Sequence, residues 1–94
     1  MLRRSGKAGV IRSLFKRFPR RRFLLVGDSG EHDPEIYGAV ARRYPRQVAG
    51  ILIRQIPGER GLRQRYAKAF RRVDADRITL FEDATELRTL RLPR

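Results

Sequence analysis

Three short apolar runs, separated by longer stretches with helical spacing, constrain the fold more than any other feature of this sequence. The runs are FLLV at 23–26, VAGILI at 48–53 and ITLF at 78–81. Short continuous apolar runs are typical of strands that are buried on both faces, as parallel sheets require. Strands that alternate with helices along a chain predict a parallel sheet with right-handed crossovers.

The segments on either side of the first run have the spacing of amphipathic helices. Ser5 is suited to cap the first helix, which Pro19 ends. We expect Asp33 to be the N-cap of the second helix, because Pro34 then stands at the first helical position, where its missing N–H does no harm. The predicted buried faces contain Val10, Ile11, Leu14, Phe15 and Phe18 in the first helix and Ile36, Tyr37, Val40, Ala41 and Tyr44 in the second.

Two more helices are predicted further along the chain. A turn-rich stretch at 57–61 leads into a third helix, and Asp83 and Glu86 have the spacing of a capping box before a short last helix with Leu87 and Leu90. We therefore expect a single α/β domain over residues 1–94, a partial Rossmann-like three-layer domain with about three parallel strands alternating with about four helices. The buried side of the third helix is predicted to contain Leu62, Tyr66, Ala69, Phe70 and Val73.

The charge balance favours anionic partners. The formal net charge is +13, and residues 1–27 contain no acidic residue. Nucleic acid phosphates and anionic membranes both attract such a surface. The chain has no cysteine for a disulfide or a thiolate zinc site, and no stretch is apolar enough to predict a membrane span. We expect a cytoplasmic protein.

The loop GDSGEHD at 27–33 follows the first predicted strand, at the edge of the sheet where ligands bind in α/β proteins. A serine nucleophile is disfavoured, because His32 is the only histidine and lies on the same loop as Ser29. Two interpretations remain open. In the first, the carboxylate oxygens of Asp28 and Asp33 are ligands of Mg²⁺, which prefers hard oxygen donors. In the second, the two residues only form a turn that starts a helix, where aspartate is common.

The residues before and after this loop, taken together with it, resemble the sequence pattern of a known family. Lys7 lies three residues before Val10, and VGDSGEHDPEIYGAVARRYP is followed by ILIR. The pattern resembles the catalytic domain of the actin-patch-type, magnesium-dependent phosphatidate phosphatases, members of the haloacid dehalogenase-like superfamily. The resemblance implies phosphomonoester hydrolysis through a phospho-aspartate intermediate. It also implies a catalytic role for Lys7, Mg²⁺ as cofactor with Asp28 and Asp33 as ligands, and substrate contacts from Ser29 and Arg54.

One departure from the family pattern limits this expectation. The nucleophile motif Asp-x-Asp-x-Thr is absent, and the first acidic residue of the chain is Asp28. The resemblance therefore implies the C-terminal half of a catalytic domain, with the lysine and magnesium motifs but without the nucleophile, and inactive by itself. The implied substrate is phosphatidate or another anionic phosphomonoester at a membrane surface.

The alternative is a non-catalytic basic module that binds RNA or anionic lipid. The high net charge and the missing nucleophile motif favour it. Nucleic acid is the weaker of the two partner classes, because the aromatic residues fall on predicted buried faces and few rings remain for base stacking.

Overall fold

Three parallel strands lie side by side in the order in which they occur in the chain. In the computed structural model, which describes residues 4–89, they are β1 (Phe23–Asp28), β2 (Val48–Arg54) and β3 (Ile78–Phe81). The pairing places Leu25 beside Ile51 and Arg54 beside Phe81. The parallel sheet predicted from the three apolar runs is confirmed.

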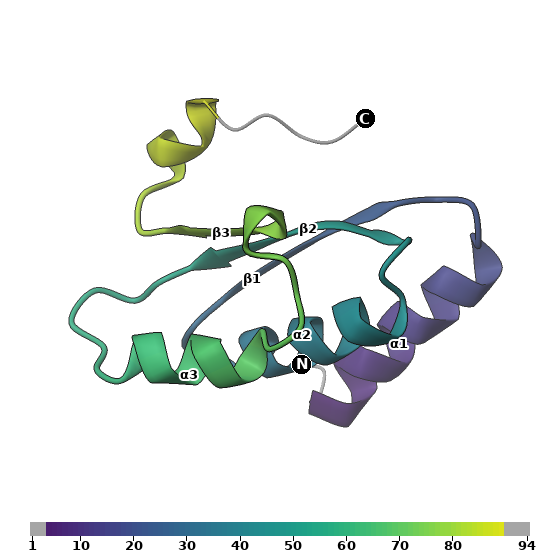
Figure 1. Ribbon diagram of the computed structural model, residues 1–94, viewed down its shortest axis with the longest axis horizontal. Coiled ribbons are helices and arrows are strands. Elements are labelled where there is room, and N and C mark those ends of the chain that lie inside the picture. The colour runs from purple at the N-terminus through teal and green to yellow at the C-terminus, as the bar shows by residue number, and fades with distance from the viewer. Residues whose placement is uncertain (1–3, 90–94) are drawn as a thin grey trace.

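The helices α1 (Arg4–Arg17), α2 (Asp33–Arg43) and α3 (Leu62–Ala69) lie together on one side of the sheet, as Figure 1 shows. Right-handed crossovers that always step in the same direction place their helices on the same face. Two short 3₁₀-helices, η1 (Ala75–Arg77) and η2 (Ala84–Thr89), pack against β2 and β3, and η2 lies on the opposite side from the α-helices. The α/β, partial Rossmann-like fold class is confirmed.

The last helix differs in type from the prediction. Residues 84–89 form the 3₁₀-helix η2, and Leu90, which was expected to belong to this helix, lies outside the described residues. The capping box in front of it is confirmed, because the Glu86 carboxylate accepts the Asp83 backbone N–H at 2.8 Å. The Asp83 carboxylate in turn accepts the backbone N–H of Thr85 at 2.9 Å.

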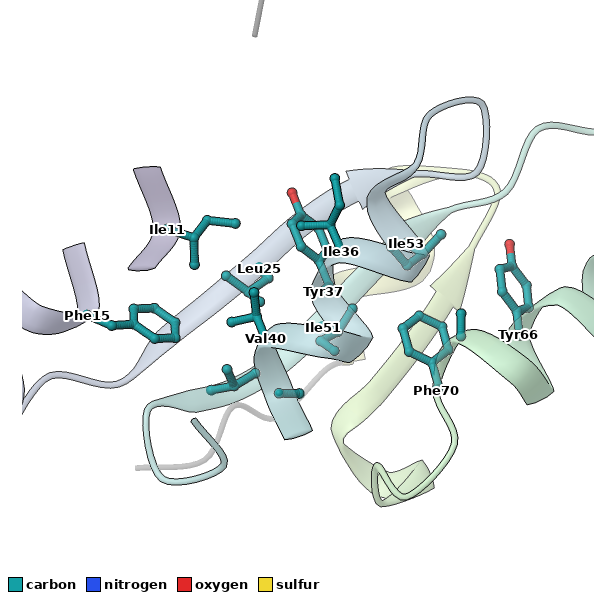
Figure 2. Close-up of a cluster of buried hydrophobic side chains, with 13 residues drawn as sticks. Ile11, Phe15, Leu25, Ile36, Tyr37, Val40, Ile51, Ile53, Tyr66 and Phe70 are labelled. Atoms are coloured by element: carbon teal, nitrogen blue, oxygen red, sulfur yellow. The ribbon is translucent and has the colours of Figure 1, made fainter. Parts of the chain in front are cut away.

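The hydrophobic core fills the space between the α-helices and the facing side of the sheet (Figure 2). Phe15 of α1 stacks on Phe23 of β1, with ring centroids 4.8 Å apart, and meets Tyr44 edge to face at 5.3 Å. Tyr37 is buried in this core, and its hydroxyl donates to the Val26 carbonyl at 2.9 Å. The faces predicted for the second and third helices are largely confirmed, because Tyr44, Leu62 and Val73 are half-buried against the core and the other predicted residues are buried. The buried ones are Ile36, Tyr37, Val40, Ala41, Tyr66, Ala69 and Phe70.

The expectation that the first strand is buried on both faces is wrong. Leu25 is 7% exposed, but its neighbours Leu24 and Val26 are 38% and 58% exposed. Their side chains alternate with Leu25 and therefore point away from the α-helices. Of the 3₁₀-helices, η1 packs against β2 and η2 packs against β3, and neither makes a comparable contact with β1. Only the inner face of β1 is therefore covered.

The predicted buried face of α1 is also too wide. Ile11 and Phe15 are buried, whereas Val10, Leu14 and Phe18 are each about 40% exposed or more. Each residue turns an α-helix by about 100°, so Val10 and Leu14 point well away from the line that joins Ile11 to Phe15. The prediction of Ser5 as the helix cap is wrong too, because α1 begins at Arg4 and Ser5 lies inside its first turn.

Candidate functional site

A short loop joins the carboxyl end of β1 to α2 and folds back on itself. The Asp28 backbone N–H donates to Oδ2 of Asp33 at 3.0 Å. The Gly30 backbone N–H donates to Oδ1 of Asp28, also at 3.0 Å. Each carboxylate predicted to bind metal therefore accepts a backbone N–H of this turn, and the turn links the two residues directly.

Asp33 does not cap α2, so that part of the sequence prediction is wrong. The N-cap residue is His32, which makes no side-chain capping bond, while Pro34 stands in the first turn as expected. The Asp33 carboxylate is turned back toward the strand, where it accepts the Asp28 N–H and meets Lys7. These partners satisfy a side chain that is 4% exposed, which explains why it does not bond to its own helix.

Lys7 and Asp33 form an ion pair between α1 and the start of α2. The Lys7 Nζ lies 2.5 Å from Oδ1 of Asp33, across a sequence separation of 26 residues. The hydrogen bond to Asp33 raises the pKa of Lys7 above its ordinary value, although partial burial acts in the opposite direction. The structure thus brings together the predicted catalytic lysine and one of the two predicted metal ligands.

Ser29, which was predicted to contact the substrate, is buried, and its hydroxyl already has two hydrogen-bond partners. It is 2% exposed, and its hydroxyl donates to Oε2 of Glu59 at 2.7 Å and accepts the backbone N–H of Ile56 at 3.0 Å. These bonds fasten the loop after β1 to the loop after β2. The substrate role of Ser29 stays a prediction, and it would require the hydroxyl to exchange one of these partners.

Arg54 ends β2 directly beside the loop. It is the register partner of Asp28, its carbonyl accepts the Ser29 N–H at 2.9 Å, and its side chain is exposed. The five residues predicted for the site therefore lie along the end of β1, the adjoining end of β2 and the turn of α1 that faces them. They are Lys7, Asp28, Ser29, Asp33 and Arg54.

Arg65 of α3 and Glu35 of α2 belong to the same region, and the sequence analysis missed both. The Arg65 guanidinium donates to the carbonyls of Ser29 and Glu31 and to both carboxylate oxygens of Glu35. This pair lowers the pKa of Glu35, because the hydrogen bond from Arg65 outweighs the effect of burial. The two residues are 30 positions apart, so no local spacing in the sequence indicates the contact.

The chemistry of the donors fits a magnesium ion. Mg²⁺ in phosphate-processing sites takes one or two carboxylates and completes its coordination with water and substrate phosphate. Asp28 and Asp33 supply two carboxylates that the turn links, and each oxygen that accepts an N–H retains a further lone pair. Within residues 6–88, whose side chains the structure describes, three His, Asp or Glu side chains do not gather at one point.

No helix in the described part of the chain has the length and apolar character needed to cross a membrane.

Comparisons with known proteins connect this geometry to a family. The family model described as the catalytic domain of phosphatidate phosphatase APP1 matches residues 1–55, a range that contains all five predicted site residues. The chain is 50% identical over 48 residues to phosphatidate phosphatase APP1 of Saccharomyces cerevisiae, and 39% identical over 54 residues to an uncharacterized protein of Schizosaccharomyces pombe.

These alignments cover 51% and 57% of this chain but 8% of each relative, so the chain spans a small part of the curated proteins it matches. No solved structure gives a significant match. The family model, in contrast, covers more than half of the chain and includes β1, the Asp28–Asp33 loop, α2 and β2. The protein belongs to the family of the phosphatidate phosphatase APP1 catalytic domain.

Proposed function

We propose that this chain is the lysine- and carboxylate-bearing part of a magnesium-dependent phosphatidate phosphatase of the haloacid dehalogenase-like superfamily. The observation that carries the proposal is the ion pair between Lys7 and Asp33 at the carboxyl end of β1. A structural salt bridge alone would not require the adjoining Asp28 and Arg54, which are the paired last residues of β1 and β2. Family membership supports the same reaction class.

Each of these residues has a separate task in phosphate chemistry. Asp28 and Asp33 would hold Mg²⁺, which when bound neutralises negative charge on the phosphoryl oxygens. Lys7 adds a fixed positive charge at the same place, and the Asp28 N–H keeps Asp33 oriented toward it. The exposed guanidinium of Arg54 is suited to a two-pronged contact with a phosphate. Ser29 would add its hydroxyl if it exchanged its bond to Glu59.

The proposed substrate is phosphatidate or a related anionic phosphomonoester presented at a membrane surface. The net charge of +13 favours such a surface. The chain contains no Asp-x-Asp-x-Thr motif, and loss of a nucleophile can reduce turnover by about a millionfold. We therefore expect the 94 residues by themselves to bind magnesium and phosphate without hydrolysing phosphatidate. The cytoplasmic location stays a prediction.

Calorimetric titration with Mg²⁺ tests the site. We expect weak binding to the wild type that is lost in Asp28→Asn. Asp74→Asn is the matched control, because it makes the same chemical change at an exposed residue just before η1, at the opposite end of β3. Equal binding by the wild type and Asp28→Asn would contradict the assignment of the metal site.

An assay with phosphatidate in mixed vesicles tests the expected inactivity. We expect no phosphate release by the purified chain at any Mg²⁺ concentration. Release that requires the metal and disappears in Asp28→Asn would show that the chain has a complete catalytic site, and it would disprove our expectation that the nucleophile is missing.

Membrane binding without catalysis is the second candidate, and one observation favours it. Val10 and Leu14 of α1 and Phe18 directly after it form an exposed apolar stripe, near the basic residues Lys16 and Arg17. An apolar stripe beside basic residues is typical of helices that lie on anionic membranes. If this is the function, vesicle binding should fall in Leu14→Ser and remain unchanged in Asp28→Asn. The phosphatase proposal predicts Mg²⁺ binding in Leu14→Ser equal to that of the wild type.

A further inference from the structure

Arg65 makes the most extensive set of polar contacts with the loop that carries Asp28 and Asp33, although it lies on α3 and outside the residues that match the family. We propose that Arg65 is a positioning residue that fixes this loop in the conformation needed for metal and phosphate binding. Only the last step, the effect of Arg65 on metal binding, rests on the proposed function. The contacts of Arg65 with the loop do not depend on it.

Two of the contacts are made to the backbone of the loop. Arg65 Nη1 donates to the Ser29 carbonyl and Nη2 donates to the Glu31 carbonyl, both at 2.6 Å. Ser29 directly follows Asp28, and Glu31 lies between the two aspartates. A single guanidinium therefore sets the path of the backbone between the two predicted metal ligands.

The other contacts fasten the loop at its far end. Arg65 Nε and Nη2 donate to the two carboxylate oxygens of Glu35, each at 2.8 Å. Glu35 lies two residues after Asp33 in the first turn of α2. Arg65 thus holds the residue after Asp28 and a residue shortly after Asp33 at the same time, which limits the movement of both carboxylates.

Glu59 extends this arrangement into the loop before α3. One of its carboxylate oxygens accepts the Ser29 hydroxyl, and the other lies 3.6 Å from Nη1 of Arg65. The segment after residue 55 therefore contributes both a cation and a carboxylate to the support of the loop. The positive charge of Arg65 is balanced within the cluster by the carboxylates of Glu35 and Glu59.

The geometry requires arginine rather than any cation. A planar guanidinium donates in several fixed directions at once, whereas a lysine ammonium is a point charge on a flexible stem. Arg65→Lys should keep the attraction to Glu35 and lose the backbone contacts to Ser29 and Glu31. This difference separates a positioning role from simple charge balance.

Amide hydrogen exchange in the full 94-residue chain tests the proposal without added metal. In Arg65→Ala and Arg65→Lys, we expect exchange at the Asp28 and Gly30 amides to accelerate by about tenfold or more, because both amides bond to the carboxylates of the loop. Exchange at Ile51 in the centre of β2 should stay unchanged. Arg63→Ala is the matched control, since Arg63 is an exposed arginine on the same helix.

Chemical rescue provides a readout that general destabilisation would not give. Millimolar guanidinium should slow exchange at Asp28 and Gly30 in Arg65→Ala, whereas sodium chloride at the same ionic strength should not. Unchanged exchange in both Arg65 variants, wild-type exchange in Arg65→Lys, or equal acceleration at Ile51 would each overturn the positioning role.

A Mg²⁺ titration of the same samples tests the last step. We expect the signals of Asp28 and Asp33 to shift in the wild type, with the half-saturating concentration about fivefold or more higher in Arg65→Ala. If Mg²⁺ does not affect the wild type, the proposed function fails while the exchange measurement still decides the role of Arg65. If Mg²⁺ binds equally to both proteins, the proposed function stands and the link from Arg65 to the metal site is disproved.

Discussion

The Asp33 carboxylate lies against the backbone of Gly27, in the space that a side chain at position 27 would occupy. A Cβ atom built on Gly27 would overlap the Asp33 carboxyl group. Asp33 reaches this place because α2 begins beside the end of β1, and its Oδ2 then accepts the Asp28 N–H. The glycine before Asp28 is therefore what allows the buried carboxylate to lie next to the strand.

Gly27→Ala should destabilise the fold by about 1–3 kcal/mol, because either Asp33 or the end of β1 must move. Chemical denaturation measures the free energy of unfolding. Gly9→Ala in α1 is the control, since no atom would crowd its new Cβ, and it should change stability little or raise it by about 0.5–1 kcal/mol. Equal stability of Gly27→Ala and the wild type would show that Asp33 does not occupy this space.

Lys7→Met should lower stability at neutral pH by about 1–3 kcal/mol, because it leaves the buried Asp33 carboxylate without its charged partner. The pKa of Lys7 is raised in the folded state, so its contribution is complete below the ordinary value of 10.5 and is lost as the pH rises through the folded value. The difference between wild type and variant should therefore shrink above pH 10.5. Lys16→Met, at an exposed position of α1, should show no such change.

Glu35→Gln should reduce the dependence of stability on pH in the acid range. Arg65 lowers the pKa of Glu35 in the folded state, so the stabilisation is present above the ordinary value of 4.5 and is lost as the pH falls through the folded value. Unfolding measured from neutral pH to below pH 4.5 should therefore show a shallower decline in Glu35→Gln. Glu82→Gln, at an exposed residue after β3, is the control and should retain the wild-type slope.

Leu25→Ala and Val26→Thr test whether β1 is covered on one face only. Leu25 is buried against the helices, so its truncation should cost about 2–5 kcal/mol. Val26 is 58% exposed, so Val26→Thr should change the free energy of unfolding by no more than about 0.5 kcal/mol. A large loss in Val26→Thr would mean that the outer face of β1 is covered after all.

The parallel fold could be predicted because its signals are local. Each apolar run is continuous, and turn residues such as Pro45 and Gly58 separate the runs from the helical segments. The helix positions of Ile36 and Val40 follow from the same periodicity and are buried as expected. The outer face of β1 could not be predicted in this way, because its exposure depends on where the 3₁₀-helices after β2 pack.

In the candidate site, too, the residues could be predicted from a local motif, whereas their long-range contacts could not. The motif placed Lys7, Asp28 and Asp33 at one edge of the sheet, and the structure brings Lys7 into contact with Asp33. The capping role expected for Asp33 was wrong, because residue preferences at helix ends do not account for a competing lysine 26 positions away. Arg65 was missed for the same physical reason, since its partners come from another helix and from backbone carbonyls.

The strand order β1-β2-β3 also determines what kind of surface the Lys7–Asp33 pair occupies. In α/β proteins a binding crevice opens where the strand order reverses, because the helices on the two sides of that point leave the sheet on opposite faces. Between residues 23 and 81 the order runs in one direction only, and Asp28 ends the strand at the edge of the described sheet. The described strands therefore contain no such reversal, and the Lys7–Asp33 pair stands at the end of a strand that has a described neighbour on one side only.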